Sequence, residues 1–123
     1  MKIKCNNGMF VCSNEADITR ILEKCANNKF DDIWINGDDE YPQLAILTNG
    51  EMQSACIHYF ISDGDFLLSV GNIDDNGKTD FCAGGQENEL ENNSVIPLSL
   101  AVKCVLQFFN TKERPTCIEW IEL

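Results

Sequence analysis

The chain contains a single histidine, His58, and Cys56 stands two positions before it. In a strand, alternate side chains point to the same face, so this pair would lie side by side. A cysteine and a histidine act as nucleophile and base only where an acid orients the histidine. No G-x-S-x-G motif and no signature of a reactive cysteine accompanies them. The pattern favours a structural, hydrogen-bonded histidine, and a small hydrolase using Cys56 and His58 remains an alternative.

Acidic residues gather in three predicted turns. Two carboxylates act as acid and base only when different environments across a cleft separate their pKa values. Turn residues exposed to water do not meet that condition. Residues 74–78 also lack the ligand order of an EF-hand calcium loop. We therefore predict no catalytic residue, no metal site and no cofactor. The acidic turns contain Asp38, Asp39, Glu40, Asp63, Asp65, Asp74 and Asp75.

The charge balance indicates which partners are suitable. Twenty acidic residues oppose nine basic ones, and the formal net charge is -11. Phosphate backbones and anionic membranes require clustered Lys and Arg, so we expect neither nucleic acid nor membrane as a direct ligand. A basic protein would be attracted, and its association would be accelerated. The charge also agrees with a second explanation, in which the acidic residues only maintain solubility.

Aromatic residues flank the first acidic turn, with Trp34 before it and Tyr41 after it. Aromatic side chains surrounded by charge are typical of protein–protein interfaces. The competing interpretation places Trp34 in the hydrophobic core. We select as interface candidates the two aromatic residues and the seven acids: Trp34, Asp38, Asp39, Glu40, Tyr41, Asp63, Asp65, Asp74 and Asp75.

Length and cysteine content indicate one domain, spanning residues 1–123, in a reducing compartment. The seven cysteines include no C-x-x-C pair, and several lie among apolar residues, which is typical of small buried hydrophobes. No disulfide framework is expected. The N-terminus lacks the apolar segment of a signal peptide, and no apolar run reaches the roughly 18 residues of a membrane span. We expect a cytoplasmic protein.

The hydrophobic pattern predicts an α+β fold with a largely antiparallel sheet of five to six strands and two helices on one face. A helix at 14–27 is capped by Ser13 or Asn14. The Asn49-Gly50 pair predicts a type I′ hairpin, and residues 84–93 are expected to be irregular. Pro97 is placed in the first turn of a helix at 97–110. Strands are predicted at 33–35, 44–48, 52–60, 66–70, 79–83 and 116–121, and the four from 44 to 83 are expected to form an antiparallel meander.

Several segments, taken in order, resemble the first-numbered immunity-protein family of bacterial polymorphic toxin systems. The resemblance runs from about residue 31 to the C-terminus and is most specific in the closing Glu-Trp-x-Glu-Leu after Arg-Pro. It implies an α+β fold and an immunity role. Members are encoded beside secreted toxins, often nucleic-acid deaminases or nucleases, and neutralise them. The matching segments are 41–47, 57–60, 66–71, 81–85, 95–98, 114–115 and 118–123.

These observations together predict an immunity protein that binds a basic toxin domain stoichiometrically and occludes its active site or substrate groove. We expect Trp120 of the closing motif to be structural. Glu119 and Glu122 could be structural or functional, and the oligomeric state stays open. A small-ligand-binding or scaffold module is the other alternative, and a concave apolar pocket would favour it.

Overall fold

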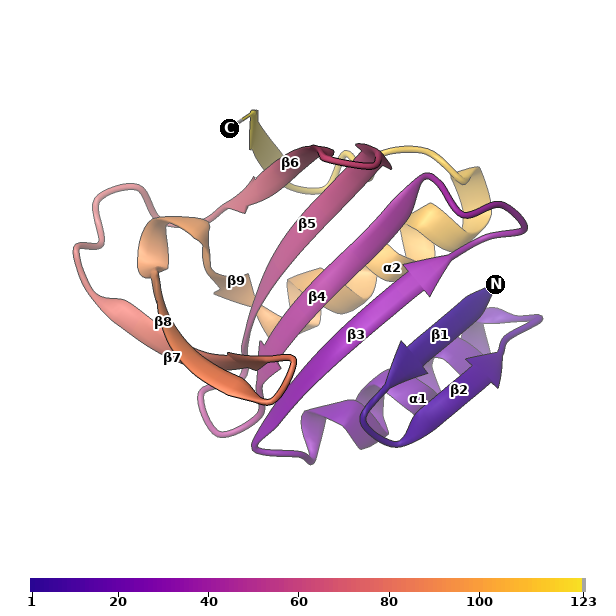
Figure 1. Cartoon of the computed structure of the whole chain (residues 1–123), viewed down its shortest axis with the longest axis horizontal. Helices are drawn as coiled ribbons and strands as arrows, with labels where there is room; N and C mark the ends of the chain where they lie inside the picture. The colour runs from indigo at the N-terminus through magenta and orange to yellow at the C-terminus, as the bar shows by residue number, and fades with distance from the viewer. Residues whose placement is uncertain (123) are drawn as a thin grey trace.

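One antiparallel sheet, with both helices on the same face, forms the body of the protein (Figure 1). The structure is a computed structural model, and it describes residues 1–122. Seven strands follow the order β10-β6-β5-β4-β3-β1-β2, and the eighth, β9, pairs with β5. The strands are β1 (Lys2–Cys5), β2 (Gly8–Val11), β3 (Phe30–Asn36), β4 (Gln43–Asn49), β5 (Ser54–Ser62), β6 (Asp65–Val70), β7 (Lys78–Ala83), β8 (Gln86–Glu91), β9 (Ile96–Pro97) and β10 (Glu119–Glu122).

The first helix, α1 (Glu15–Ala26), begins where the sequence predicts. The side-chain oxygen of Asn14 accepts a hydrogen bond of 2.8 Å from the backbone N–H of Asp17, which satisfies one of the free donors of the first turn. Two acidic residues in that turn are favoured by the helix dipole. The buried face of α1 consists of Ile18, Ile21, Leu22 and Cys25.

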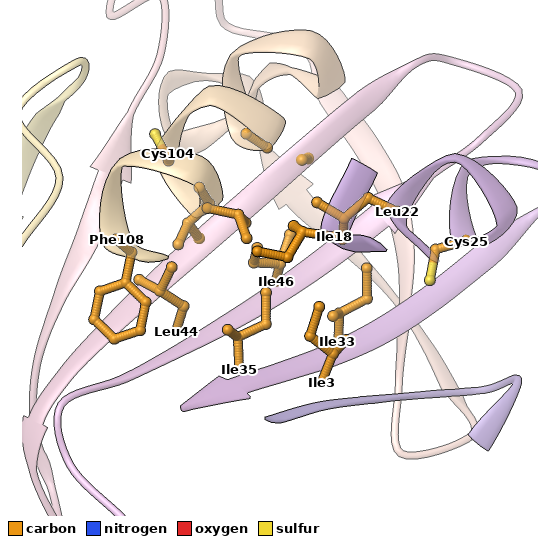
Figure 2. Close-up of a cluster of buried hydrophobic side chains, with 14 of the residues drawn as sticks. Ile3, Ile18, Leu22, Cys25, Ile33, Ile35, Leu44, Ile46, Cys104 and Phe108 are labelled. Carbon is orange, nitrogen blue, oxygen red and sulfur yellow. The ribbon is translucent and has the colours of Figure 1, made fainter. Parts of the chain in front are cut away.

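The second helix, α2 (Leu98–Thr111), is the apolar helix predicted at 97–110. Pro97 lies just before it, in β9, instead of in its first turn. The helix ends at Lys112, whose left-handed φ of 56° terminates the helical hydrogen bonding. Side chains of α1 and α2 converge on those of β1, β3 and β4 in one core (Figure 2). The predicted α+β class, with two helices on one face, is confirmed.

The strand count is higher than predicted, and the meander is shorter. Strands β4, β5 and β6 pair in order, but β7 leaves the sheet and pairs with β8. The β8 segment was expected to be irregular. Its sequence, Gln-Glu-Asn-Glu-Leu-Glu, is almost entirely polar, so it carries no apolar alternation that would predict a strand. Gly84 and Gly85, with φ of +59° and +82°, supply the left-handed turn that joins the two strands.

The prediction of a two-residue turn at Asn49-Gly50 is wrong. Asn49 pairs with Ser54, so four residues form the connection. Gly50 is required for another reason, because a Cβ atom there would lie 2.4 Å from the carbonyl oxygen of Ala26 and 2.2 Å from that of Asn28. The glycine permits a close approach between this loop and the end of α1.

The two ends of the chain also form strands. β1 and β2 were not predicted, because each is only four residues long, and β1 contains two lysines. The last predicted strand, 116–121, is shorter and lies at 119–122. Trp120 is structural as expected, since its indole N–H donates a 2.8 Å hydrogen bond to the carbonyl of Pro115 and its ring lies 5.9 Å from that of Tyr59. Among residues 1–122, neither helix has the length and apolar character to cross a membrane.

Candidate protein interface

Four ring-bearing side chains form a cluster on the sheet face opposite the helices. Strand alternation directs Ile33, Ile57 and their alternate neighbours toward the helices, and the residues between them toward the other face. The ring centroids are separated by 6.1 Å for Trp34–Phe60, 5.2 Å for Phe60–Phe66 and 5.3 Å for His58–Phe66. Trp34 is 36% exposed and the others are half-buried. We call Trp34, His58, Phe60 and Phe66 the aromatic cluster.

The β7–β8 hairpin covers the other half of the same face. Two hydrogen bonds fix it: the Asn49 amide donates to the carbonyl of Asp80 at 2.9 Å, and the Gly84 N–H donates to Asp32 Oδ2 at 3.0 Å. Phe81 is fully buried where β7 contacts β3 and β4. The face is therefore divided into a covered half beneath the hairpin and an open half that carries the aromatic cluster.

Two of the three predicted acidic turns lie at the open half. Gln43 pairs with Phe60, and Phe60 pairs with Phe66, so the β3–β4 loop and the β5–β6 turn meet at one end of the sheet. The five acids there are exposed: Asp38, Asp39, Glu40, Asp63 and Asp65.

The pKa of the Tyr41 phenol reflects the short distance between these two turns. Its pKa is raised by partial dehydration, and then by the negative charges of Asp63 and Glu40. Asp63 comes from the β5–β6 turn and Glu40 from the β3–β4 loop, so the tyrosine lies within the influence of both. The sequence prediction of an aromatic residue among acids therefore describes the geometry of this end of the sheet.

The third predicted acidic turn lies elsewhere. Asp74 and Asp75 follow β6, whose far end lies opposite the β5–β6 turn (Figure 1). The Asp75 carboxylate accepts hydrogen bonds from the Gly77 N–H at 2.8 Å and from the Asn92 amide at 3.2 Å. These bonds organise the loop itself. The structure thus brings the candidates at 34–41 and 63–65 together and separates 74–75 from them.

A groove adjoins the open half where it meets the tip of the hairpin. Its volume is about 350 Å³, and Trp34 forms part of its wall. Trp34 is therefore not a core residue, contrary to the competing interpretation. The lining residues are Lys4, Cys5, Asn6, Asp32, Trp34, Cys82, Gly84 and Gly85.

The sequence contains a pattern that predicts the aromatic cluster, although Phe60 and Phe66 were not among the predicted interface residues. Residues 55–60 are apolar or aromatic at nearly every position, which differs from the alternation of a sheet with one buried face. Such a run indicates that both faces of a strand are covered, or that one is covered and the other is available to a partner. Phe60 and Phe66 could have been selected as interface residues on that basis.

The Cys56–His58 pair does not form an activated nucleophile. Cys56 is buried, and burial raises the pKa of its thiol to about 11, although a hydrogen bond from the Ser69 hydroxyl opposes this. Burial lowers the pKa of His58, so the imidazole is neutral at pH 7. Within the described residues, aromatic contacts and not the expected hydrogen bond hold its ring.

The core offers little room for a small ligand. The cavity between the helices and the sheet, lined by Leu22, Ile46, Val105 and neighbouring side chains, measures about 10 Å³. Small-molecule sites typically have volumes of roughly 300–1,000 Å³. The larger groove beside Trp34 is open to solvent and lies next to the aromatic cluster. The geometry therefore favours contact with a macromolecule over enclosure of a small one.

Two comparisons with known proteins identify the family to which the chain is similar. The family model described as "Immunity protein Imm1" matches residues 13–122. A double-stranded DNA deaminase immunity protein from Burkholderia cenocepacia (strain H111) is 29% identical over 85 residues, which cover 68% of this chain and 67% of that protein. The family match begins at residue 13, earlier than the expected residue 31. It therefore includes α1 and excludes both β1 and β2.

Proposed function

The chain belongs to the Imm1 immunity protein family, and on that premise we propose that it neutralises a nucleic-acid deaminase toxin through the open half of its sheet. The deaminase is suggested by the similar protein from Burkholderia cenocepacia, whose own partner class is given by its name. Binding is stoichiometric, and it blocks the toxin's active site or the groove through which substrate enters.

The aromatic cluster is the observation that carries this proposal. A few aromatic anchors near the centre of an interface usually provide most of the binding free energy. Trp34 is exposed although it stacks on Phe60, so its ring can enter a pocket on a partner without a change in the core. The groove beside it provides a complementary recess for a partner side chain.

The charge around the cluster supports a basic partner domain. A deaminase acting on nucleic acid needs Lys and Arg along its substrate groove to hold the phosphates. The five acids of the two turns border the open half, and the whole chain carries a net charge of -11. The immunity protein would therefore occupy the toxin's phosphate-binding surface and exclude the substrate by charge complementarity.

Occlusion of this kind requires no catalysis by the immunity protein. The raised pKa of Cys56 leaves its thiol protonated at neutral pH, which is unsuitable for the Cys56–His58 hydrolase alternative. A hydrolase would inactivate the toxin with turnover, so a small amount would suffice. A binding protein must be present in an equal amount.

The test uses the toxin domain that an immunity role predicts to be encoded beside this gene. Deamination of duplex DNA is measured while increasing amounts of the immunity protein are added to a fixed, concentrated sample of toxin. We expect activity to fall linearly and to reach zero at one equivalent, with a single complex in size-exclusion chromatography. Complete loss of toxin activity at much less than one equivalent of the immunity protein would contradict stoichiometric binding. If a neighbouring toxin without deaminase activity were neutralised, the immunity role would stand and the deaminase assignment would fail.

A further inference from the structure

Three side chains converge at the base of the N-terminal hairpin, and one of them, Cys5, also lines the groove beside Trp34. Cys5 ends β1, Cys25 lies in the last turn of α1 and Asp31 lies in β3, and one ligand atom from each lies within 4.8 Å of the others. We propose that these residues bind a zinc ion, which joins β1, α1 and β3. This inference is independent of the proposed function.

Asp31 is prepared for such a role by its hydrogen bonds. The side chain is fully buried, and its Oδ1 accepts from the N–H groups of Asn6 at 2.9 Å and Asp32 at 2.8 Å. Its Oδ2 accepts a hydrogen bond from the Asn28 amide at 2.9 Å, and a carboxylate oxygen has a second lone pair that can face the two thiols. Hydrogen bonds of this kind orient the ligands of metal sites.

The negative charge of Asp31 has no cationic partner nearby. Within residues 1–122 the one ion pair joins Arg20 to Asp17, on the exposed side of α1. A buried carboxylate is costly unless it is paired or coordinates a metal, and hydrogen bonds offset only part of that cost. The hydrogen bonds explain how Asp31 organises the adjoining loops, but they do not explain why two thiols converge on it.

The ligand types indicate which metal would bind. Cysteine thiolates and carboxylates are typical ligands of Zn²⁺, whereas Mg²⁺ and Ca²⁺ prefer oxygen ligands and bind sulfur poorly. Zn²⁺ prefers four ligands in a tetrahedral arrangement, and the three side chains leave one position for water. Cys5 is half-buried and Asn6 beside it is exposed, so solvent can reach that position.

Sequence spacing could not show this site, since β2 and most of α1 lie between the two cysteines, which form no C-x-x-C pair. The site also has a structural consequence. β1 and β2 precede the matched family segment, and in the sheet β1 contacts β3, where Lys4 pairs with Trp34. A bound ion would therefore secure the strand that supports one side of the groove.

The test titrates the full-length, reduced and chelator-treated protein with Zn²⁺ by calorimetry, and separately with Co²⁺, whose thiolate complexes absorb in the near ultraviolet. We expect one equivalent of each metal to bind. The Cys5→Ser variant removes a half-buried ligand and should weaken binding by more than about 100-fold, beyond the effect of losing a supporting residue. Asp31→Asn, which keeps the side-chain shape, should also weaken it. Cys117→Ser, at an exposed cysteine far along the chain, is the matched control and should bind normally.

Three results would overturn the proposal. One is the absence of a thiolate–cobalt absorption band in the folded wild-type protein, which does not depend on the stability of any variant. Another is unchanged affinity in Cys5→Ser. The third is a Cys5–Cys25 disulfide, found by mass spectrometry in protein alkylated directly in the cells that produce it, since an oxidised pair cannot supply thiolate ligands.

Discussion

The two ends of the main sheet look alike in sequence and differ in structure. Each carries an acidic connection between strands: residues 37–42 and 63–64 at one end, and residues 71–77 at the other. At the first end the aromatic cluster lies uncovered beside the acids. At the second the β7–β8 hairpin covers the sheet and buries Phe81. An acidic turn therefore indicates an interface only where it borders apolar side chains that a partner can cover.

The carboxylates at the two ends of the sheet also differ in their hydrogen bonds. Asp75 accepts hydrogen bonds from Gly77 and Asn92 and holds its own loop together. The carboxylates of Asp38 and Asp39 make no hydrogen bond or ion pair within the part of the chain that the structure describes. They remain free to meet cationic side chains of a partner. The comparison predicts that matched substitutions at the two ends will have different effects on toxin binding.

The largest difference in toxin affinity between the two ends is expected when exposed apolar side chains are removed. Trp34→Ala should raise the dissociation constant for the toxin by about 30-fold or more, corresponding to roughly 2 kcal/mol for an anchor residue. The matched control is Ile73→Ala, at the far end, where the side chain is 72% exposed. It should leave affinity unchanged. Surface plasmon resonance with both variants measures the two effects.

A loss of binding in Trp34→Ala has meaning only if the variant is folded. Since the ring is partly exposed and lies outside the helix-facing core, the variant should keep a cooperative unfolding transition. Equal affinities for Trp34→Ala and wild type would exclude the open half as the centre of the interface.

The next difference concerns charge. Replacing Asp38 and Asp39 by Asn should slow association with the toxin on the order of tenfold at low salt, because it removes charges that attract a basic partner. The same change at Asp74 and Asp75 removes equal charge at the far end and should have a smaller effect. The difference between the two pairs should diminish as salt is added, since exposed charges are screened. Stopped-flow association rates at several salt concentrations test this, and equal rates for both pairs would contradict local steering.

The sequence predicted well those features that depend on local chemistry. The cap at Asn14, the apolar stripe of α1 and the apolar run of α2 gave both helices within one or two residues. Strands β3 to β6 followed from short apolar runs between turn residues. The polar strand β8 and the short strands β1 and β2 were missed, because hydrogen bonding to a neighbour and not hydrophobic pattern defines them.

The candidate site was predicted only in part, for a related reason. Acidic turns are visible along the chain, but which of them share an end depends on how the strands pair. The pairing placed residues 63–65 beside 38–41 and removed 74–75. The hairpin that covers half of the sheet is held by hydrogen bonds between residues distant in the sequence. Asn49 and Asp80 are 31 positions apart, and Asp32 and Gly84 are 52 positions apart, so no local pattern predicts these contacts.

The smallest expected effect concerns His58 of the aromatic cluster, which lies two residues after the buried Cys56 and two before Phe60. Burial lowers the pKa of His58 below its usual value of 6.5. Above that pH the imidazole is neutral in both the folded and unfolded states. As the pH falls through about 6.5, the unfolded chain binds the proton more readily, so the free energy of unfolding decreases. Urea unfolding between about pH 7.5 and about pH 5.5 should show this decrease, and His58→Gln should show less of it.

The same histidine can report where the toxin sits. A partner on the open half would cover His58 further and would disfavour its protonated form still more, so affinity should decrease with acidification in the wild-type protein. The His58→Gln variant should lose that part of the pH dependence, while the titration of the surrounding acids affects both proteins equally. If affinity depended on pH identically in the two proteins, the toxin would not cover His58, and contact with this part of the aromatic cluster would be excluded.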